Sequence, residues 1–203
     1  MKVYLIRHAR TDANEKGQYV GRIDIPISDD GRKAAESLTP FADVKKVYVS
    51  PMIRTKETAG ILFPNSQVVL NEGLKELDFG HFEGKSYEDM KDDPKYTKWV
   101  DNGALEACPG GEDPIDFGTR VYKALMEILE EAQENGEDTI YVVTHGGVIM
   151  SLIYQLQGCE GQLFDYMSKN CGGWSFEVSE GIADRDIKIT GINAFADTDE
   201  IGE

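Results

Sequence analysis

Short apolar runs alternate along the chain with stretches in which apolar residues recur every three or four positions. Compact runs rich in β-branched and aromatic residues lie at 3–6, 44–49, 68–70 and 139–144, and each predicts a buried strand. Strands that alternate with amphipathic helices form a mostly parallel sheet with helices on both faces. The pattern therefore predicts an α/β fold of three layers, α/β/α, with the sheet in the middle.

Local start signals place helices between these strands. Ser28 before two aspartates predicts one helix N-terminus, and Ser50-Pro51 predicts a second, with serine as the N-cap and proline at the first helical position. Another helix is expected at 147–156, directly after the fourth strand. The longest helix is predicted from one apolar face that comprises Val121, Leu125, Ile128, Leu129 and Ala132.

The segment from about 77 to 115 differs from the rest of the chain. Glycine, charged and aromatic residues mix there, which predicts a helical lid inserted beside the sheet. Two late apolar runs, at 174–178 and 187–192, are expected to add edge strands, and the acidic residues 196–203 are expected to fray. No repeat or Pro/Gly/Ser-rich linker divides the sequence, so we expect residues 1–203 to form a single domain with this lid.

The charge balance argues against two classes of partner. The chain has 203 residues, with 21 Lys plus Arg against 37 Asp plus Glu, and a formal net charge of −16. Nucleic acids and anionic membrane surfaces both require a basic excess, so neither is expected as a partner. A small anionic substrate is compatible with this balance, provided that a few arginine and histidine side chains converge on one pocket.

Cysteine usage and the apolar stretches bear on location. The three cysteines are odd in number and lack a CxxC pair, which disfavours a disulfide framework or a structural zinc site and favours a reducing compartment. Charged residues occur too early for a signal peptide, and the most apolar stretch, 139–154, is broken by His145-Gly146-Gly147. We expect a cytoplasmic protein that does not span a membrane.

Arg7-His8, at the end of the first predicted strand, is the strongest chemical signal in the chain. A guanidinium group binds a phosphoryl group through two parallel hydrogen bonds. A neutral imidazole nitrogen attacks phosphorus and forms a covalent phosphohistidine. An isolated Arg-His pair is more often a charged pair at a strand end, so further residues must decide between the two interpretations.

Three further segments favour phosphoryl chemistry. Arg54 lies early in the helix after the second strand, and Glu76 lies in a loop that supplies carboxylates. His145 directly follows the fourth strand, and Gly146 after it offers a backbone N–H at a helix start, where anions bind. Ligands of parallel sheets bind beyond the carboxyl ends of the strands, so the two histidines that follow strands are expected to meet there.

In this order, the motifs resemble those of the histidine phosphatase superfamily, which includes the phosphoglycerate mutase-like enzymes. The resemblance extends from Arg7-His8 to about Asn170-Cys171 and implies a phosphoric monoester hydrolase with a histidine nucleophile. The candidate site comprises the catalytic residues His8, Glu76 and His145 and the substrate-binding residues Arg7, Asn14, Arg54 and Gly146.

The resemblance also implies a mechanism. Arg7, Arg54 and a protonated His145 offset the charge of the phosphate and of the transition state. Neutral His8 attacks in line while protonated Glu76 donates to the leaving alcohol, and the same carboxylate then takes a proton from the attacking water. Glu76 is therefore expected to have a raised pKa. Imidazole and carboxylate groups suit zinc, but the two adjacent arginines would repel a cation at His8, His145 and Glu76. Neither a metal nor another cofactor is expected.

Neighbouring residues carry weaker signals. Ala9 stands where glycine is usual in the family and Arg10 where an acidic residue is frequent, and we interpret both as tuning of the site. His81 is expected to pack in its loop or lie at the rim, and Glu83 to tie that loop down. Glu112 fits either the positive end of the long helix or a substrate contact at the pocket mouth.

The superfamily includes both mutases and phosphatases, and the sequence must be compared with each. Mutases carry a longer insertion between the acid and the second histidine, and a tail that excludes water; both are short here, which favours hydrolysis. The segments 74–84 and 109–112 resemble α-ribazole phosphatases and broad-specificity bacterial phosphatases. A cofactor-dependent phosphoglycerate mutase and a non-catalytic phospho-ligand binder are the alternatives. The expected partner is a small phosphorylated substrate, and a homodimer through edge strands is compatible with the pattern.

Overall fold

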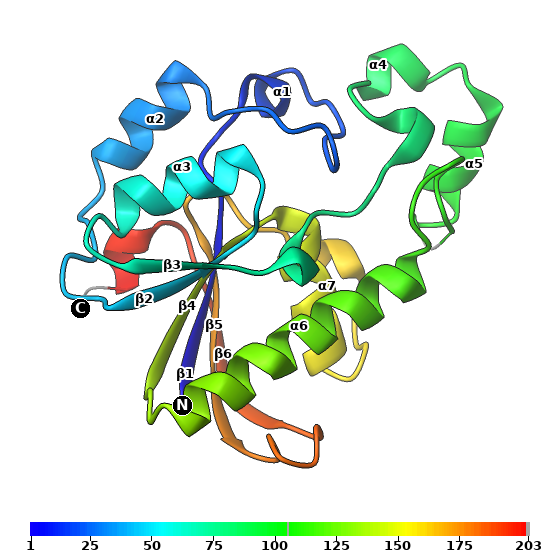
Figure 1. The fold of residues 1–203 in the computed structure, drawn as a ribbon. Coiled ribbons are helices and arrows are strands. Elements are labelled where there is room, and N and C mark those ends of the chain that lie inside the picture. The colour runs from blue at the N-terminus through cyan, green and yellow to red at the C-terminus, as the bar shows by residue number, and fades with distance from the viewer. Residues whose placement is uncertain (105, 202–203) are drawn as a thin grey trace.

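Four parallel strands form the centre of the structure, a computed structural model that describes residues 1–104 and 106–201 (Figure 1). Within these ranges the sheet order is β3-β2-β4-β1-β5-β6, in which β5 runs antiparallel to β1 and β6 antiparallel to β5. The strands are β1 (Lys2–Arg7), β2 (Lys46–Val49), β3 (Gln67–Leu70), β4 (Thr139–Thr144), β5 (Gly173–Glu180) and β6 (Lys188–Phe195). The predicted mostly parallel sheet is confirmed. Only β6 of the two late runs is an edge strand, because β5 pairs with β1 on its other side.

Helices follow the parallel strands and connect them. The longest one, α6, begins where Asp113 caps the N–H of Ile115 and Pro114 takes the first helical position, and it then buries one apolar stripe. The helices are α1 (Asp12–Glu15), α2 (Asp29–Glu36), α3 (Ile53–Leu62), α4 (Tyr87–Met90), α5 (Pro94–Asp101), α6 (Pro114–Glu134) and α7 (Gly146–Leu156), with 3-10 turns η1 (Glu72–Leu74), η2 (Gly80–Phe82), η3 (Leu163–Tyr166) and η4 (Thr198–Ile201).

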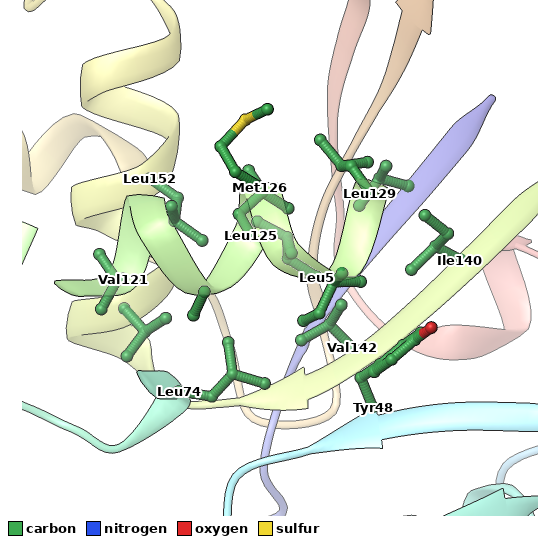
Figure 2. Close-up of a cluster of buried hydrophobic side chains, with 14 of the residues drawn as sticks. Leu5, Tyr48, Leu74, Val121, Leu125, Met126, Leu129, Ile140, Val142 and Leu152 are labelled. Atoms are coloured by element: carbon green, nitrogen blue, oxygen red, sulfur yellow. The ribbon is translucent and has the colours of Figure 1, made fainter. Parts of the chain in front are cut away.

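Alternating side chains of β1 enter two different cores. Val3 and Leu5 pack with α6 and α7, as Figure 2 shows for Leu5, whereas Tyr4 and Ile6 pack on the opposite face with α3. Buried apolar surface of this kind contributes about 25 cal/mol per Å² to folding. Helices thus cover both faces of the sheet, and the predicted three-layer α/β/α arrangement is confirmed.

Helices α4 and α5 extend away from the sheet, at the upper right of Figure 1. They share a separate apolar cluster whose buried members are Phe82, Met90, Tyr96, Trp99 and Cys108. The hydroxyls of Tyr19 and Tyr96 lie 2.9 Å apart and connect this cluster to the loop before α2. A lid at about 77–115 within one domain stays our interpretation of this arrangement; residues 105, 202 and 203 lie outside the described part of the chain.

The predicted start of the helix after β2 is wrong. Helix α3 begins at Ile53, with Met52 rather than Ser50 as its N-cap. The Ser50 hydroxyl is buried and lies 2.7 Å from Nε2 of His145, so it is not available to cap a helix. The expected Ser50-Pro51 cap is thus replaced by a contact with the candidate site.

The acidic end of the chain is more ordered than expected. Thr198 is buried, and Oδ1 of Asp199 accepts the N–H of Thr39 at 2.7 Å, which attaches η4 to the segment after α2. Residues 202 and 203 of the expected frayed segment are not described. None of the described helices is long and apolar enough to cross a membrane.

Candidate active site

The two predicted histidines meet at the carboxyl edge of the sheet. His8 follows β1 and His145 follows the neighbouring strand β4, and their ring centroids lie 5.3 Å apart in an edge-to-face arrangement. The N–H of His8 donates to the carbonyl of Thr144 at 2.9 Å, which continues the pairing of the two strands by one residue. Strand register therefore positions both rings.

His8 is held in one tautomer. Its Nδ1 lies 2.7 Å from the carbonyl oxygen of Ala9, and a carbonyl only accepts, so Nδ1 carries the proton. Burial lowers the pKa of His8 well below its usual range, and the guanidinium groups of Arg54 and Arg7 lower it further. The ring is therefore neutral at neutral pH, with the lone pair on Nε2.

His145 is also neutral, which corrects the expectation that it is protonated. Its Nδ1 accepts a hydrogen bond from Nε of Arg54 at 3.2 Å, so the proton is on Nε2, which faces the Ser50 hydroxyl. Burial lowers the pKa of His145 well below its usual range, with Arg54 as the next cause. Both ring nitrogens have partners, so direct binding of phosphate by His145 stays a prediction.

The two predicted arginines are arranged differently. Arg7 lines a cavity and donates from Nη1 to the carbonyl of Ser168 at 2.6 Å, while its buried Nε has no hydrogen-bond partner among the described residues. Arg54 is buried behind His145, and its Nη atoms donate to carbonyls of loop 20–23. Arg7 is therefore the guanidinium with unused donor capacity at the cavity, whereas Arg54 also shapes the loop.

Glu76 lies against the start of α7. Its Oε2 accepts the N–H of Gly147 at 2.8 Å, and its Oε1 accepts the N–H of Leu77 at 2.9 Å. Burial nevertheless raises the pKa of the Glu76 carboxyl, because loss of hydration outweighs these hydrogen bonds and the nearby arginines. The raised pKa is the direction expected from the sequence. The anion site predicted at this helix start thus accepts the chain's own carboxyl group.

The neighbouring Gly146 makes room for the guanidinium group of Arg7. A Cβ atom at Gly146 would lie 3.3 Å from both Cζ and Nε of Arg7, closer than ordinary van der Waals contact. The glycine pair after His145 therefore lets Arg7 and Glu76 approach the helix start from two sides. A direct contact between Gly146 and substrate stays a prediction.

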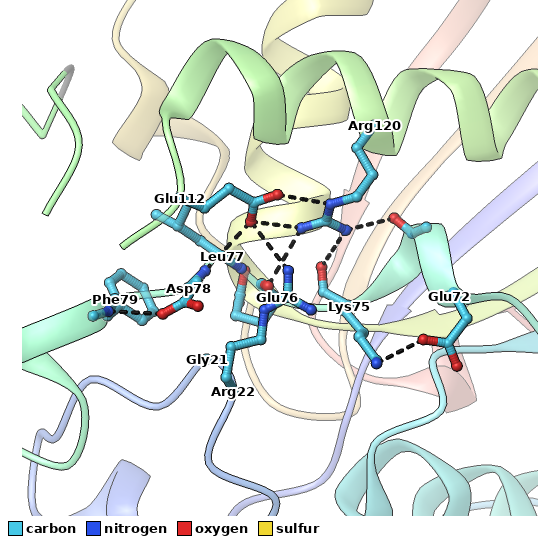
Figure 3. Close-up of polar contacts among 12 residues, drawn as sticks. Gly21, Arg22, Glu72, Lys75, Glu76, Leu77, Asp78, Phe79, Glu112 and Arg120 are labelled. Atoms are coloured by element: carbon cyan, nitrogen blue, oxygen red, sulfur yellow. Dashed lines mark hydrogen bonds and ion pairs between the residues drawn. The ribbon is translucent and has the colours of Figure 1, made fainter. Parts of the chain in front are cut away.

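A salt-bridge network holds the segment that carries Glu76 (Figure 3). Arg120 on α6 pairs with both carboxylate oxygens of Glu112, at 2.9 and 2.8 Å. The same guanidinium donates to the carbonyls of Gly73 and Lys75, at 2.8 and 2.9 Å. Arg120 thereby fixes the backbone just before the candidate acid.

Five of the predicted site residues or their neighbours open onto one cavity of about 630 Å³. These are Arg7, His8, Asn14, Glu76 and Gly147. Arg54, His145 and Gly146 do not line the cavity but contact the lining residues Val20, His8 and Arg7, respectively. The structure therefore brings the predicted set together, with part of it forming the wall and part supporting the wall.

The weaker candidates lie outside the cavity lining. Oxygens of Glu83 accept the N–H groups of loop residues 21–23, so its expected structural role is confirmed. His81 is exposed and lies over Gly110. Glu112 neither caps α6, which Asp113 does, nor lines the cavity.

The two departures from the family pattern also leave the cavity unchanged. Arg10 pairs with Glu15 at 3.2 Å and is half-exposed, outside the cavity lining. Ala9 is buried, and its N–H donates to the Thr58 hydroxyl at 2.8 Å. Neither residue places a charge on the cavity wall, so neither observation supports tuning of substrate charge.

Three supporting residues were missed in the sequence. Ser50 holds His145, and Arg120 holds the Glu76 segment. Nδ2 of Asn170 donates to the carbonyl of His8 at 2.9 Å and lies 3.4 Å from Oδ1 of Asn14. Ser50 follows the parallel strand β2, so the strand-end rule that identified the histidines would have found it. Nothing local marks Arg120 or Asn170.

Metal ligation finds no support in the side-chain arrangement. Over residues 1–104 and 106–201, no group of three or more His, Cys, Asp or Glu side chains is placed to hold a metal ion.

Comparison with known proteins assigns most of the chain to one family. A family described as the histidine phosphatase superfamily (branch 1) matches residues 3–181. The adenosylcobalamin/alpha-ribazole phosphatase of Escherichia coli K12 is 28% identical over 182 residues, covering 86% of this chain and 88% of that protein. Phosphoserine phosphatase 1 of Hydrogenobacter thermophilus is 27% identical over 186 residues, covering 88% and 85%.

Solved structures share the fold. The alpha-ribazole phosphatase of Shigella flexneri superposes with a TM-score of 0.77 at 24% identity, over 95% of this chain and 96% of that one. The family match spans most of the chain, including every residue of the candidate site. The chain therefore belongs to the histidine phosphatase superfamily, which its motifs resemble, and its phosphatase-named relatives support a phosphoric monoester hydrolase.

Proposed function

We propose that the chain is a metal-independent phosphomonoesterase that transfers the phosphoryl group of a small metabolite to His8 and then to water. The tautomer of His8 carries this proposal. Its Nδ1–H is engaged by the carbonyl of Ala9, so the lone pair of Nε2 is available at the cavity that His8 lines. Glu76 lines the same cavity and has a raised pKa, so a nucleophile and an acid face one substrate.

The chemistry proceeds in two steps. Nε2 of His8 forms a bond to phosphorus while the bond from phosphorus to the leaving oxygen breaks, and the proton of Glu76 passes to that oxygen. The Glu76 carboxylate then removes a proton from water, whose oxygen attacks phosphorus as the nitrogen–phosphorus bond breaks. Arg7 offsets charge on the phosphoryl oxygens, and neither step needs a metal ion or an organic cofactor.

Hydrolysis is favoured over mutase activity by the short segment between Glu76 and His145, which lie 69 positions apart, because mutases carry a longer insertion there. Within the described residues 196–201, Asp199 contacts Thr39, and none of the six lines the cavity. A pocket without a long insertion over it admits water to the phosphohistidine. A non-catalytic phospho-ligand binder is disfavoured because His8, Glu76 and His145 are all present and assembled.

We further propose α-ribazole 5′-phosphate as the substrate. The support is the relative in E. coli that carries this activity in its name, together with similarity over most of both chains. A relative named for phosphoserine covers a similar share, so a panel that contains both substrates discriminates between them.

Phosphate release from an aryl phosphate in the presence of EDTA tests the reaction itself. We expect turnover by the wild type and none above background by His8→Ala. His81→Ala is the matched control, because His81 is exposed and outside the cavity lining, and it should retain full activity. Turnover that EDTA abolishes, or that survives in His8→Ala, would overturn the proposal.

A further inference from the structure

Charge is confined to one end of the cavity. Among the lining side chains that the structure describes, Arg7 is the only arginine or lysine and Glu76 is the only aspartate or glutamate. His8, which also lines the cavity, is held neutral. Arg7 and Glu76 both contact the glycines at the start of α7, next to His8. The phosphoryl group therefore binds at this end, and the rest of the cavity receives the alcohol part of the substrate.

The remaining wall is largely apolar. Its large apolar and aromatic members come from the loop before α2, the segment 77–115, α6, α7 and the segment around η3, and they include Tyr19, Trp99, Ile115, Met150, Phe164 and Met167. Three of these are unusually open for their type: Ile115 is 78%, Met167 60% and Phe164 49% exposed. An apolar ligand group placed in the cavity would cover such surface.

Three cations near the cavity are paired with carboxylates, and Arg54 donates to backbone carbonyls of loop 20–23. Arg22 and Arg120 both bind the carboxylate of Glu112, and Arg10 binds Glu15. No lysine, and no arginine except Arg7, belongs to the cavity lining within the described ranges. A second anionic group on a substrate would lose its hydration here without gaining a counter-charge.

From this wall we infer that the chain selects phosphate monoesters whose alcohol is uncharged and carries an aromatic or bulky apolar group, and that it rejects alcohols bearing a second anion. The inference rests on the proposed hydrolysis and adds the class of leaving group. It favours a nucleoside-like substrate such as α-ribazole 5′-phosphate over phosphoserine or phosphoglycerates.

Three primary alkyl phosphates test the selection in the wild type: 2-phenylethyl phosphate, ethyl phosphate and 3-phosphooxypropanoate. We expect kcat/KM for the phenylethyl ester to exceed that for the ethyl ester by about tenfold or more, and the carboxylate ester to be the poorest. Equal values for the three esters, or a preference for the carboxylate, would overturn the inference while leaving the proposed hydrolysis intact. No turnover of any ester would overturn the hydrolysis itself.

One added charge tests the role of the wall. Met167 lies at the rim, next to Ser168, whose carbonyl binds Arg7, so Met167→Lys places a cation near the alcohol site. We expect this variant to raise the carboxylate-to-phenylethyl ratio of kcat/KM by about tenfold. Val68→Lys adds the same charge on the exposed strand β3 and should leave the ratio unchanged. An equal shift in both variants, or none in Met167→Lys, contradicts the inference.

Discussion

The N–H of Gly147 donates to Oε2 of Glu76 at 2.8 Å, and a Cβ atom at Gly147 would lie 2.3 Å from Oε1 of the same carboxyl group. The backbone of α7 therefore defines where the candidate acid sits, and only glycine leaves the space. This contact joins two residues that lie 71 positions apart in the sequence.

Gly147→Ala should displace the Glu76 carboxyl group without unfolding the chain, because the colliding atom is the end of a side chain. A misplaced catalytic group lowers the rate by about 10²-fold, so we expect kcat to fall on that order while far-UV circular dichroism stays unchanged. Gly60→Ala is the control, since a Cβ there meets nothing within 4 Å; it should keep kcat and raise helix stability by up to about 1 kcal/mol. Equal kcat values for the two variants would contradict the positioning role.

Glu76→Gln should make the rate depend on the leaving group. An alkyl alcohol needs a proton as it leaves, so kcat/KM for ethyl phosphate should fall by about 10²–10⁴-fold. The nitrophenolate of 4-nitrophenyl phosphate leaves without a proton, so its kcat/KM should fall far less. Glu83 is a carboxyl group of the same loop and binds the backbone of residues 21–23. Glu83→Gln should therefore lower kcat/KM for both substrates by the same factor. A similar loss for both substrates in Glu76→Gln would assign the acid to another group.

Arg120→Met should slow catalysis without weakening phosphate binding. Arg120 holds the backbone before Glu76, whereas Arg7 and His8 at the phosphate end are untouched. We expect kcat to fall by up to about 10²-fold and the inhibition constant of inorganic phosphate to stay within about twofold. Lys123→Met, on the exposed side of the same helix, is the control.

Glu112, which pairs with Arg120, allows a second test of the same role through a double-mutant cycle on kcat. Glu112→Gln should reproduce much of the loss, and the double variant should lose less than the two single losses combined, because the residues act as one unit. Fully additive losses in the double-mutant cycle would mean that the two side chains act independently.

Two buried neutral histidines should make folding sensitive to acid. The pKa values of His8 and His145 lie well below the ordinary 6.5, so the unfolded chain binds protons that the folded chain does not. The free energy of unfolding should therefore fall as pH decreases below 6.5, by up to about 1.4 kcal/mol per pH unit for each histidine. Urea unfolding at a series of pH values measures this slope.

His145→Asn should reduce the acid sensitivity by about half, because one of the two protonation sites is removed. Glu76 acts in the opposite direction: its raised pKa contributes stability at low pH that is lost as pH rises through the folded-state value. An unchanged slope in His145→Asn would show that other groups dominate acid unfolding.

Much of the fold follows from local patterns in the sequence. The strand at 139–144 has the predicted bounds, and the Arg7-His8 and His145 positions follow from strands that end at one sheet edge. These features depend on periodicity and on the strand-end rule alone.

Features that depend on distant partners were not predictable. Ser50 has the composition of a helix cap, but tertiary contact with His145 takes its hydroxyl. The neutral state of His145 depends on its burial and on Arg54, which lies 91 positions away. The order of the acidic end depends on Asp199 reaching Thr39, and no local pattern specifies that contact.

A covalent phosphoenzyme on His8 is the central claim, and rapid quenching during turnover tests it most directly. Wild type is mixed with an aryl phosphate in the presence of EDTA, denatured in base, and digested for mass spectrometry. The account predicts one acid-labile phosphoryl group on the peptide that contains His8, and none in His8→Ala. Turnover with no phosphoryl group on that peptide, or with the group on another residue, would contradict it.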